Sequence, residues 1–279
     1  MKRFFSYLVL LLSFIWSLGV SAQNTLVELE NIKSRGSDFK LDGTFTTFAS
    51  TNTYGFDSPE KSLSQDFIFS GRLSTPGGYI ISSSLWFNKD FKNERELNVR
   101  DSLVSITKPY GEIVKGISLT NRASLTLALS EFSDKTAGLI TAARYNPILS
   151  HQATYLLDGL TIIYRPTFIW NFHEFNNRTD GASNYQQTIN QRVTLFYMAT
   201  ESLFLSLDNT YIKSWSYDGN TNDIYSLDQS VTYAPNRDLS FFLGHSIGGN
   251  SLAVNGQETK IEIFDTRQSQ YYIGLSYQF

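Results

Sequence analysis

The last nine residues constrain the fold of this chain more than any other segment. Apolar side chains occupy every second position there, and mostly polar or small ones occupy the positions between. A period of two residues indicates a β-strand with one apolar face. The apolar parity consists of Tyr271, Ile273, Leu275, Tyr277 and Phe279. Such a strand alone could close a soluble β-sandwich as well as a β-barrel, so the rest of the chain has to distinguish these two folds.

The same alternation recurs along the chain, most cleanly over 116–129 and 159–172. Pro166 interrupts the second of these segments, and we expect a bulge or a missing hydrogen bond there rather than a strand end. After the first 22 residues, no apolar run approaches the length of a membrane helix. A closed barrel is the other structure that satisfies all backbone polar groups in lipid. Aromatic residues make up 15% of the chain, which suits the aromatic girdles of such barrels.

The N-terminus has the pattern of a secretory signal. Lys2 and Arg3 precede an apolar run from Phe4 to Val20, and small residues follow up to Ala22. A charged start, an apolar stretch and a small-residue cleavage site are typical of a signal peptide. We therefore predict a signal peptide over 1–22, a polar periplasmic lead-in over 23–38 and one barrel domain over 39–279.

About twelve strands are predicted, with ten or fourteen as the alternatives. Short turns and longer polar loops alternate between them, and an even number of strands returns both termini to the periplasm. The short turns include Pro109–Glu112, and residues 149–156 are expected to form an unusually long turn. The predicted strands are 39–50, 62–73, 79–88, 97–107, 115–129, 138–148, 157–172, 187–199, 203–215, 224–234, 239–248 and 266–279. The predicted outer loops are 51–61, 89–96, 130–137, 173–186, 216–223 and 249–265.

The final strand resembles the C-terminal signal of Gram-negative outer-membrane proteins, an alternating aromatic and apolar strand that ends in Phe. This resemblance implies an antiparallel transmembrane β-barrel in the outer membrane. It also implies recognition of Tyr271, Ile273, Leu275, Tyr277 and Phe279 by the barrel-assembly machinery. Lipid and lipopolysaccharide are the surroundings expected for such a barrel. The sequence indicates no oligomeric state.

Six arginines and four aspartates inside the predicted strands fall on the parity opposite the apolar face, so they should point into the lumen. Because an Arg facing lipid at mid-depth costs roughly 2–4 kcal/mol, inward arginines are expected in any barrel. Their clustering on neighbouring strands is more informative. The predicted pore-lining arginines are Arg72, Arg100, Arg122, Arg144, Arg165 and Arg192, and the last five form an arginine wall on consecutive strands. The predicted pore-lining acids are Asp42, Asp66, Asp208 and Asp228.

Two interpretations of these charges lead to different functions. A transverse field across a water-filled pore would orient and select charged solutes. Such a protein would be a porin-like channel for small hydrophilic solutes, with anions favoured by the arginine wall. The twelve-stranded porins that transport acidic sugars are an analogy at the level of the protein class, and an analogy of fold carries little weight for function. Alternatively, the charges pair and close the interior, which would make the protein a structural or surface-adhesion barrel.

An outer-membrane hydrolase is the third hypothesis. His245-Ser246 resembles part of the His/Ser/Asn site of the outer-membrane phospholipase, but adjacent residues point to opposite faces, and Ile247 stands where a serine is needed. His173 and Asp180 resemble the Asp-His pair of omptin proteases only in residue type. With no cysteine and no histidine pair at metal spacing, we predict no catalytic, metal or cofactor site. Without Lys2 and Arg3 the net charge is about −5, which argues against nucleic acid as a partner.

Overall fold

The computed structural model describes residues 39–92, 95–251, 261 and 269–279. The predicted signal peptide 1–22 and lead-in 23–38 lie outside the described residues. The regular secondary structure of the described residues is β-strand, apart from a short π-helix η1, Phe132–Thr136. Its strands are β1 Lys40–Asn52, β2 Leu63–Ser74, β3 Ile80–Asp90, β4 Leu97–Val99, β5 Ser102–Val114, β6 Ile117–Leu127, β7 Leu139–Gln152, β8 Leu160–His173, β9 Tyr185–Met198, β10 Leu203–Ser216, β11 Thr221–Tyr233, β12 Leu239–Asn250 and β13 Gln270–Gln278.

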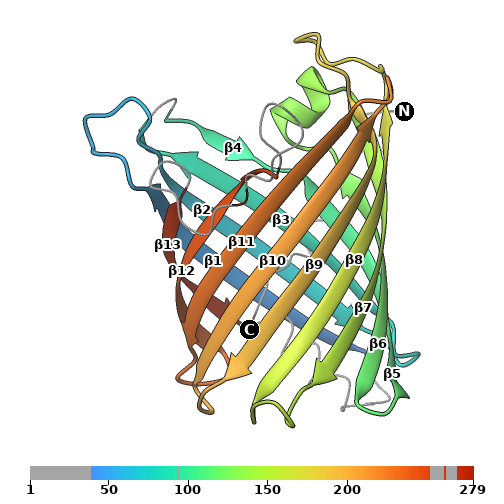
Figure 1. Cartoon of the computed structure of the whole chain (residues 1–279), viewed down its shortest axis with the longest axis vertical. Helices are drawn as coiled ribbons and strands as arrows, with labels where there is room; N and C mark the ends of the chain where they lie inside the picture. The colour runs from blue at the N-terminus through green and yellow to red at the C-terminus, as the bar shows by residue number, and fades with distance from the viewer. Residues whose placement is uncertain (1–38, 93–94, 252–260, 262–268) are drawn as a thin grey trace.

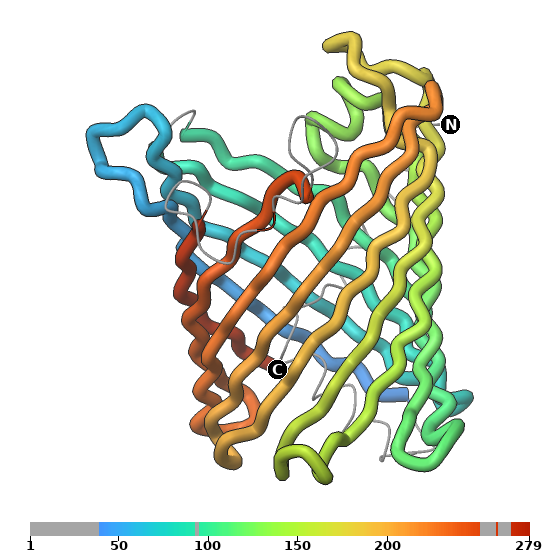
Figure 2. The backbone as a smooth tube through the Cα atoms, viewed as in Figure 1, coloured from blue at the N-terminus to red at the C-terminus, as the bar shows by residue number. Residues whose placement is uncertain are grey.

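The strands form one closed antiparallel barrel (Figure 1). Apart from β4, each strand pairs with the strands before and after it, so that β3 pairs with β5. β1 pairs with both β2 and β13, which joins the two ends of the described barrel. Twelve strands close the ring, and β4 is a short additional strand paired with β3. The backbone trace in Figure 2 shows how strongly the strands tilt, as closure of a barrel requires. The predicted all-β barrel of about twelve strands is confirmed.

The two faces of the barrel differ as the alternation predicts. Large apolar side chains are exposed on the outer face, with Leu125, Leu243 and Ile273 each more than half exposed. Small polar side chains fill the inner face, where Thr46 and Thr194 are fully buried. A barrel with an apolar exterior and a polar interior reverses the usual arrangement of a soluble domain, and this is the distribution that lipid on the outside requires. Among the described residues, no helix is long and apolar enough to cross a membrane.

Most predicted connections of the described residues are present near their expected positions, but three differ clearly, and the predicted outer loop 249–265 lies mostly outside the described residues. The predicted turn Pro109–Glu112 is wrong, because β5 continues to Val114 and the chain turns at Lys115–Gly116. Register shifts between Pro109 and Gly111, and between Glu112 and Val114, accommodate the proline and the positive φ of Gly111 as bulges within the strand.

The long turn expected at 149–156 begins later, since β7 continues to Gln152 and pairs with β6 as far as His151. The outer loop expected over 216–223 is also shorter. Only residues 217–220 separate β10 from β11, and Gly219 provides the positive φ that a tight turn needs.

The predicted strand 97–107 is two strands, because the chain breaks at Arg100–Asp101. The Asp101 carboxylate accepts hydrogen bonds from the backbone N–H groups of Leu129 and Ser130 at 3.1 and 2.9 Å, and from the Ser133 hydroxyl. These contacts tie the break to the loop that contains η1.

The interruption predicted at Pro166 is present, and β8 runs through it. No β7–β8 pair lies between the pair Tyr145 and Phe168 and the pair Leu149 and Tyr164. In this register Pro147 of β7 lies opposite Pro166 of β8, so the ladder opens where neither strand has an N–H to donate. Asn146 bridges the opening, because its side-chain amide donates to the Pro166 carbonyl oxygen at 2.9 Å.

Glycines permit close packing where β1, β12 and β13 meet. On the outer face, the Phe279 ring lies over Gly43, and the two residues exchange backbone hydrogen bonds of 2.8 and 2.9 Å. On the inner face, a Cβ atom at Gly274 would lie 2.4 Å from the Thr47 carbonyl oxygen. No Cβ atom tolerates that distance, so closure of the barrel requires glycine at 274.

We predict that Gly274→Ala weakens the seam between β1 and β13. The new methyl group would force the two strands apart, and such overpacking costs about 1–3 kcal/mol. Gly55→Ala is the matched control, because a Cβ atom there meets nothing within 4 Å. Thermal unfolding of the detergent-solubilised barrels, followed by the gel shift between folded and boiled protein, measures the difference. Equal stability of the two variants would contradict this account of the seam.

Candidate functional site: a charged cavity inside the barrel

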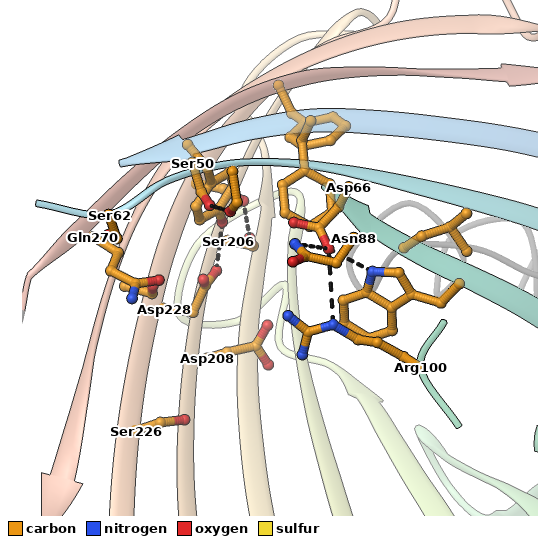
Figure 3. A pocket seen from close by; sticks show the side chains of 18 of the residues that line it. Ser50, Ser62, Asp66, Asn88, Arg100, Ser206, Asp208, Ser226, Asp228 and Gln270 are labelled. Atoms are coloured by element: carbon orange, nitrogen blue, oxygen red, sulfur yellow. Dashed lines mark hydrogen bonds and ion pairs between the residues drawn. The ribbon is translucent and has the colours of Figure 1, made fainter. Parts of the chain in front are cut away.

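A cavity of about 650 Å³ lies within the barrel, between the walls formed by β1–β3 and β9–β13. This volume falls in the range of pockets that hold small ligands. Figure 3 shows carboxylate, guanidinium, amide and hydroxyl groups from both walls pointing into it. Its charged lining consists of Asp66, Asp90, Asp208, Asp228, Arg100 and Arg192. The formal charge of these six side chains is −2.

Asp66 is the centre of a hydrogen-bonded cluster on the β2–β3 wall. Its carboxylate is only 3% exposed. The Trp86 indole N–H donates to Oδ1 at 2.6 Å, and the Asn88 amide donates to the same oxygen at 3.0 Å (Figure 3). The Arg100 guanidinium lies 3.9 Å from this oxygen and 4.7 Å from the centre of the Trp86 ring. Several donors therefore share the stabilisation of this buried anion.

Arg192 and Asp208 form a bidentate ion pair in the interior. Arg192 on β9 reaches diagonally to β10, where its Nε and Nη2 each donate to one carboxylate oxygen of Asp208 at 2.7 Å. The Thr194 hydroxyl donates to the same carboxylate. Two parallel N–H donors from one guanidinium fix its geometry as well as its charge. Asp208 is 4% exposed, so its charge depends on these donors.

Asp228 has a different environment. It lies directly opposite Asp208 across the β10–β11 pair. The Tyr272 hydroxyl donates to its Oδ1 at 2.8 Å. The Tyr272 ring in turn packs with Phe48 and Phe242, and the three ring centroids are 6.1–6.2 Å apart. We call Phe48, Phe242 and Tyr272 the aromatic cluster; all three line the cavity.

The other arginines of the predicted wall lie on β6–β8. Arg165 is the direct neighbour of Arg192 across the β8–β9 pair. Arg144 donates to the Thr126 hydroxyl at 3.1 Å, and Arg122 donates to the Thr107 hydroxyl at 3.2 Å. Because Arg122 pairs with Asn146, two residues from Arg144, these two guanidinium groups also come from neighbouring positions. Their part in a pore stays a prediction.

Arg100, Arg72 and Asp42 lie elsewhere. Arg100 was predicted to lie within a strand as part of the arginine wall, but it lies at the break between β4 and β5 and contacts Asp66. Arg72 is buried on β2 directly opposite Asp42 on β1. Asp42 also pairs with Lys40 at 3.0 Å. The charges therefore separate into a basic side on β6–β8, the charged cavity, and a third group on β1–β2.

His245 and His173 do not form the phospholipase-like or protease-like arrangements that their sequence neighbours resemble. Ser246 lines the cavity, whereas the His245 Nε2 atom lies 2.9 Å from the hydroxyl of the fully buried Ser269. His173 packs edge-on against Tyr217, and Asp180 pairs with Arg178.

The sequence did not predict the uncharged side chains that donate hydrogen bonds to the aspartates of the cavity. Trp86 and Asn88 share the inward parity of their strand with Ser82, and Tyr272 lies on the polar parity of β13. An aromatic side chain on an otherwise polar, inward parity was the feature of the sequence that indicated such a partner.

Comparison with solved structures finds the same fold in outer-membrane channels. The chain is similar to the KdgM porin at 8% identity and a TM-score of 0.50, covering 85% of this chain and 99% of that one. It is similar to the NanC porin at 11% identity and a TM-score of 0.53, with the same coverage. It also resembles the COG4313 outer membrane channel of Pseudomonas putida F1 at 10% identity and a TM-score of 0.54, covering 86% and 95%.

These likenesses establish the fold of the chain as the barrel of outer-membrane channels. No family model matches the sequence, and the search of curated proteins finds no match.

We predict that Arg192→Ala destabilises the barrel more than Arg100→Ala. Loss of Arg192 removes the bidentate partner of buried Asp208, and breaking a buried pair in this way costs about 3 kcal/mol. Arg100 is half exposed and Asp66 keeps two other donors, so its loss should cost less than about 1 kcal/mol. Denaturant unfolding in lipid vesicles gives both values. A larger loss for Arg100→Ala would refute this assignment of the pairs.

Proposed function

We propose that this protein is a porin-like channel in a Gram-negative outer membrane, through which small hydrophilic solutes diffuse passively. The observation that carries the proposal is the polar, charged cavity enclosed by a closed barrel of twelve strands. Eight strands leave room only for side chains, whereas barrels of sixteen or more enclose an aqueous channel. A barrel of twelve strands has an interior of intermediate width, and a cavity of this kind suits small solutes.

The exterior of the molecule supports placement in the outer membrane. Exposed apolar side chains cover the outer face, and the solved structures of similar fold include two porins and an outer membrane channel. Lipid and lipopolysaccharide would surround the barrel. The barrel-assembly machinery would recognise β13 together with Phe279. No catalytic step and no cofactor is part of this proposal.

The separation of charge inside the barrel supports a selective passage. Arg122, Arg144 and Arg165 lie on β6–β8, and the cavity with its excess of aspartates lies between the remaining walls. A passage between sides of opposite charge orients a dipolar solute. The arginines would supply the attraction for anions that we expect from the sequence.

A closed structural barrel is the second candidate. The bidentate pair of Arg192 with Asp208 and the donors around Asp66 favour it, because paired charges can fill an interior without serving a solute. Conductance in planar bilayers separates the two functions. Defined single-channel steps from correctly folded protein are expected for the channel. Conductance no higher than that of the bilayer alone would reject the channel and favour the closed barrel.

We predict that Arg122→Ser combined with Arg165→Ser moves the reversal potential in a salt gradient toward cation selectivity. Two positive charges would leave a confined and poorly screened passage. Lys115→Ser combined with Lys135→Ser is the control, because it removes the same charge from a turn and from the exposed helix η1. An unchanged reversal potential together with a loss of several kcal/mol in stability would instead support a charge-paired interior.

A further inference from the structure

In one part of the cavity an acidic group lies next to an apolar surface. This part is lined by the consecutive strands β11, β12, β13 and β1. Asp228 and the aromatic cluster meet there, because Tyr272 belongs to the cluster and donates its hydroxyl to Asp228. Small hydroxyl side chains, among them Ser226 and Ser246, also line this part of the cavity, together with the Gln270 amide.

Glycines fix the position of the aromatic cluster. A Cβ atom at Gly244 would lie 2.2 Å from the Tyr272 ring, and one at Gly274 would lie 2.6 Å from the Phe242 ring. The rings therefore lie directly on the backbone of β12 and β13, where a larger residue would displace them into the cavity. This arrangement leaves space in front of the cluster, and the ring faces carry the partial negative charge that attracts a cation.

The charges around Asp228 are unbalanced in favour of the anion. Asp208 lies directly opposite and is held by both donors of Arg192, whereas the group that donates to Asp228 at 2.8 Å is a neutral hydroxyl. Like charges on facing positions repel one another. A cation placed in the cavity beside Asp228 would relieve that repulsion and offset the formal charge of −2 of the lining.

We propose that this part of the cavity binds small organic ammonium ions, with the positive charge at the Asp228 carboxylate and the apolar groups against the aromatic cluster. A carboxylate next to aromatic rings attracts an organic cation by charge and by cation–π contact together, and the rings distinguish it from a bare metal ion. The inference adds a site for ammonium groups on the aspartate-rich side of the passage, apart from the arginines of β6–β8 that would attract anions, and it rests on the proposed function for the entry of the solute from water.

Direct binding tests the proposal independently of conductance. Choline is titrated into the folded full-length protein in a non-ionic detergent by calorimetry, with its uncharged isostere 3,3-dimethyl-1-butanol (dimethylbutanol) as the matched ligand. Choline should bind at least about tenfold more tightly, because the isostere lacks the charge but has the same shape. Equal affinity of the two ligands, or no binding of either, would overturn the proposal.

Variants locate the site. Asp228→Asn should weaken choline binding by at least about tenfold, since the amide keeps an acceptor for Tyr272 but not the charge. Asp42→Asn makes the same replacement at an aspartate outside the cavity lining and should leave binding unchanged. Phe242→Leu should weaken choline more than it weakens dimethylbutanol. Equal effects of Asp228→Asn and Asp42→Asn, in barrels that remain folded by the gel-shift assay, would place the ammonium elsewhere.

The two proposals fail in different ways. A barrel that conducts but does not bind choline would reject the ammonium site and keep the channel. A barrel that binds choline, responds to Asp228→Asn and does not conduct would reject the channel and keep the site.

Discussion

The hydrogen-bonded seam between β1 and β13 is the contact on which the rest of the structure depends. Nine residue pairs from Thr44 to Asn52 join the first and last strands, and the backbone groups of Gly43 and Phe279 extend the seam. Without it the sheet would present two edges with unpaired N–H and C=O groups, which lipid does not satisfy. Closure also creates an enclosed interior, so the cavity and its charges exist only because this seam forms.

Enclosure changes what a charged side chain costs. On the wall of an open sheet, Asp208 and Asp228 would face bulk water, and their facing positions would matter little. Inside the barrel they share a confined space, and the different groups that hold them divide their roles. Arg192 fixes Asp208 as part of the structure, whereas Asp228 beside the aromatic cluster is left for a solute in our proposal.

Much of the fold could be predicted from the sequence, because inside and outside follow from a period of two that each strand carries locally. The errors arose where a local rule had a non-local exception. Pro109 and Gly111 have the composition of a turn, but the ladder with β6 continues past them as bulges. Arg100 has the correct parity for a strand, but Asp101 bonds to the loop before η1 and breaks the strand.

The sequence by itself determined the barrel, its approximate strand number, and which parity of each strand faces inward, since these depend on the order of residues along one strand. Only the tertiary structure decided which inward residues meet. The contact of Arg192 with Asp208 is a diagonal across two strands, and that of Tyr272 with Asp228 joins strands that are not adjacent in the sheet. Such contacts depend on register, tilt and closure of the whole ring, which a single strand does not encode.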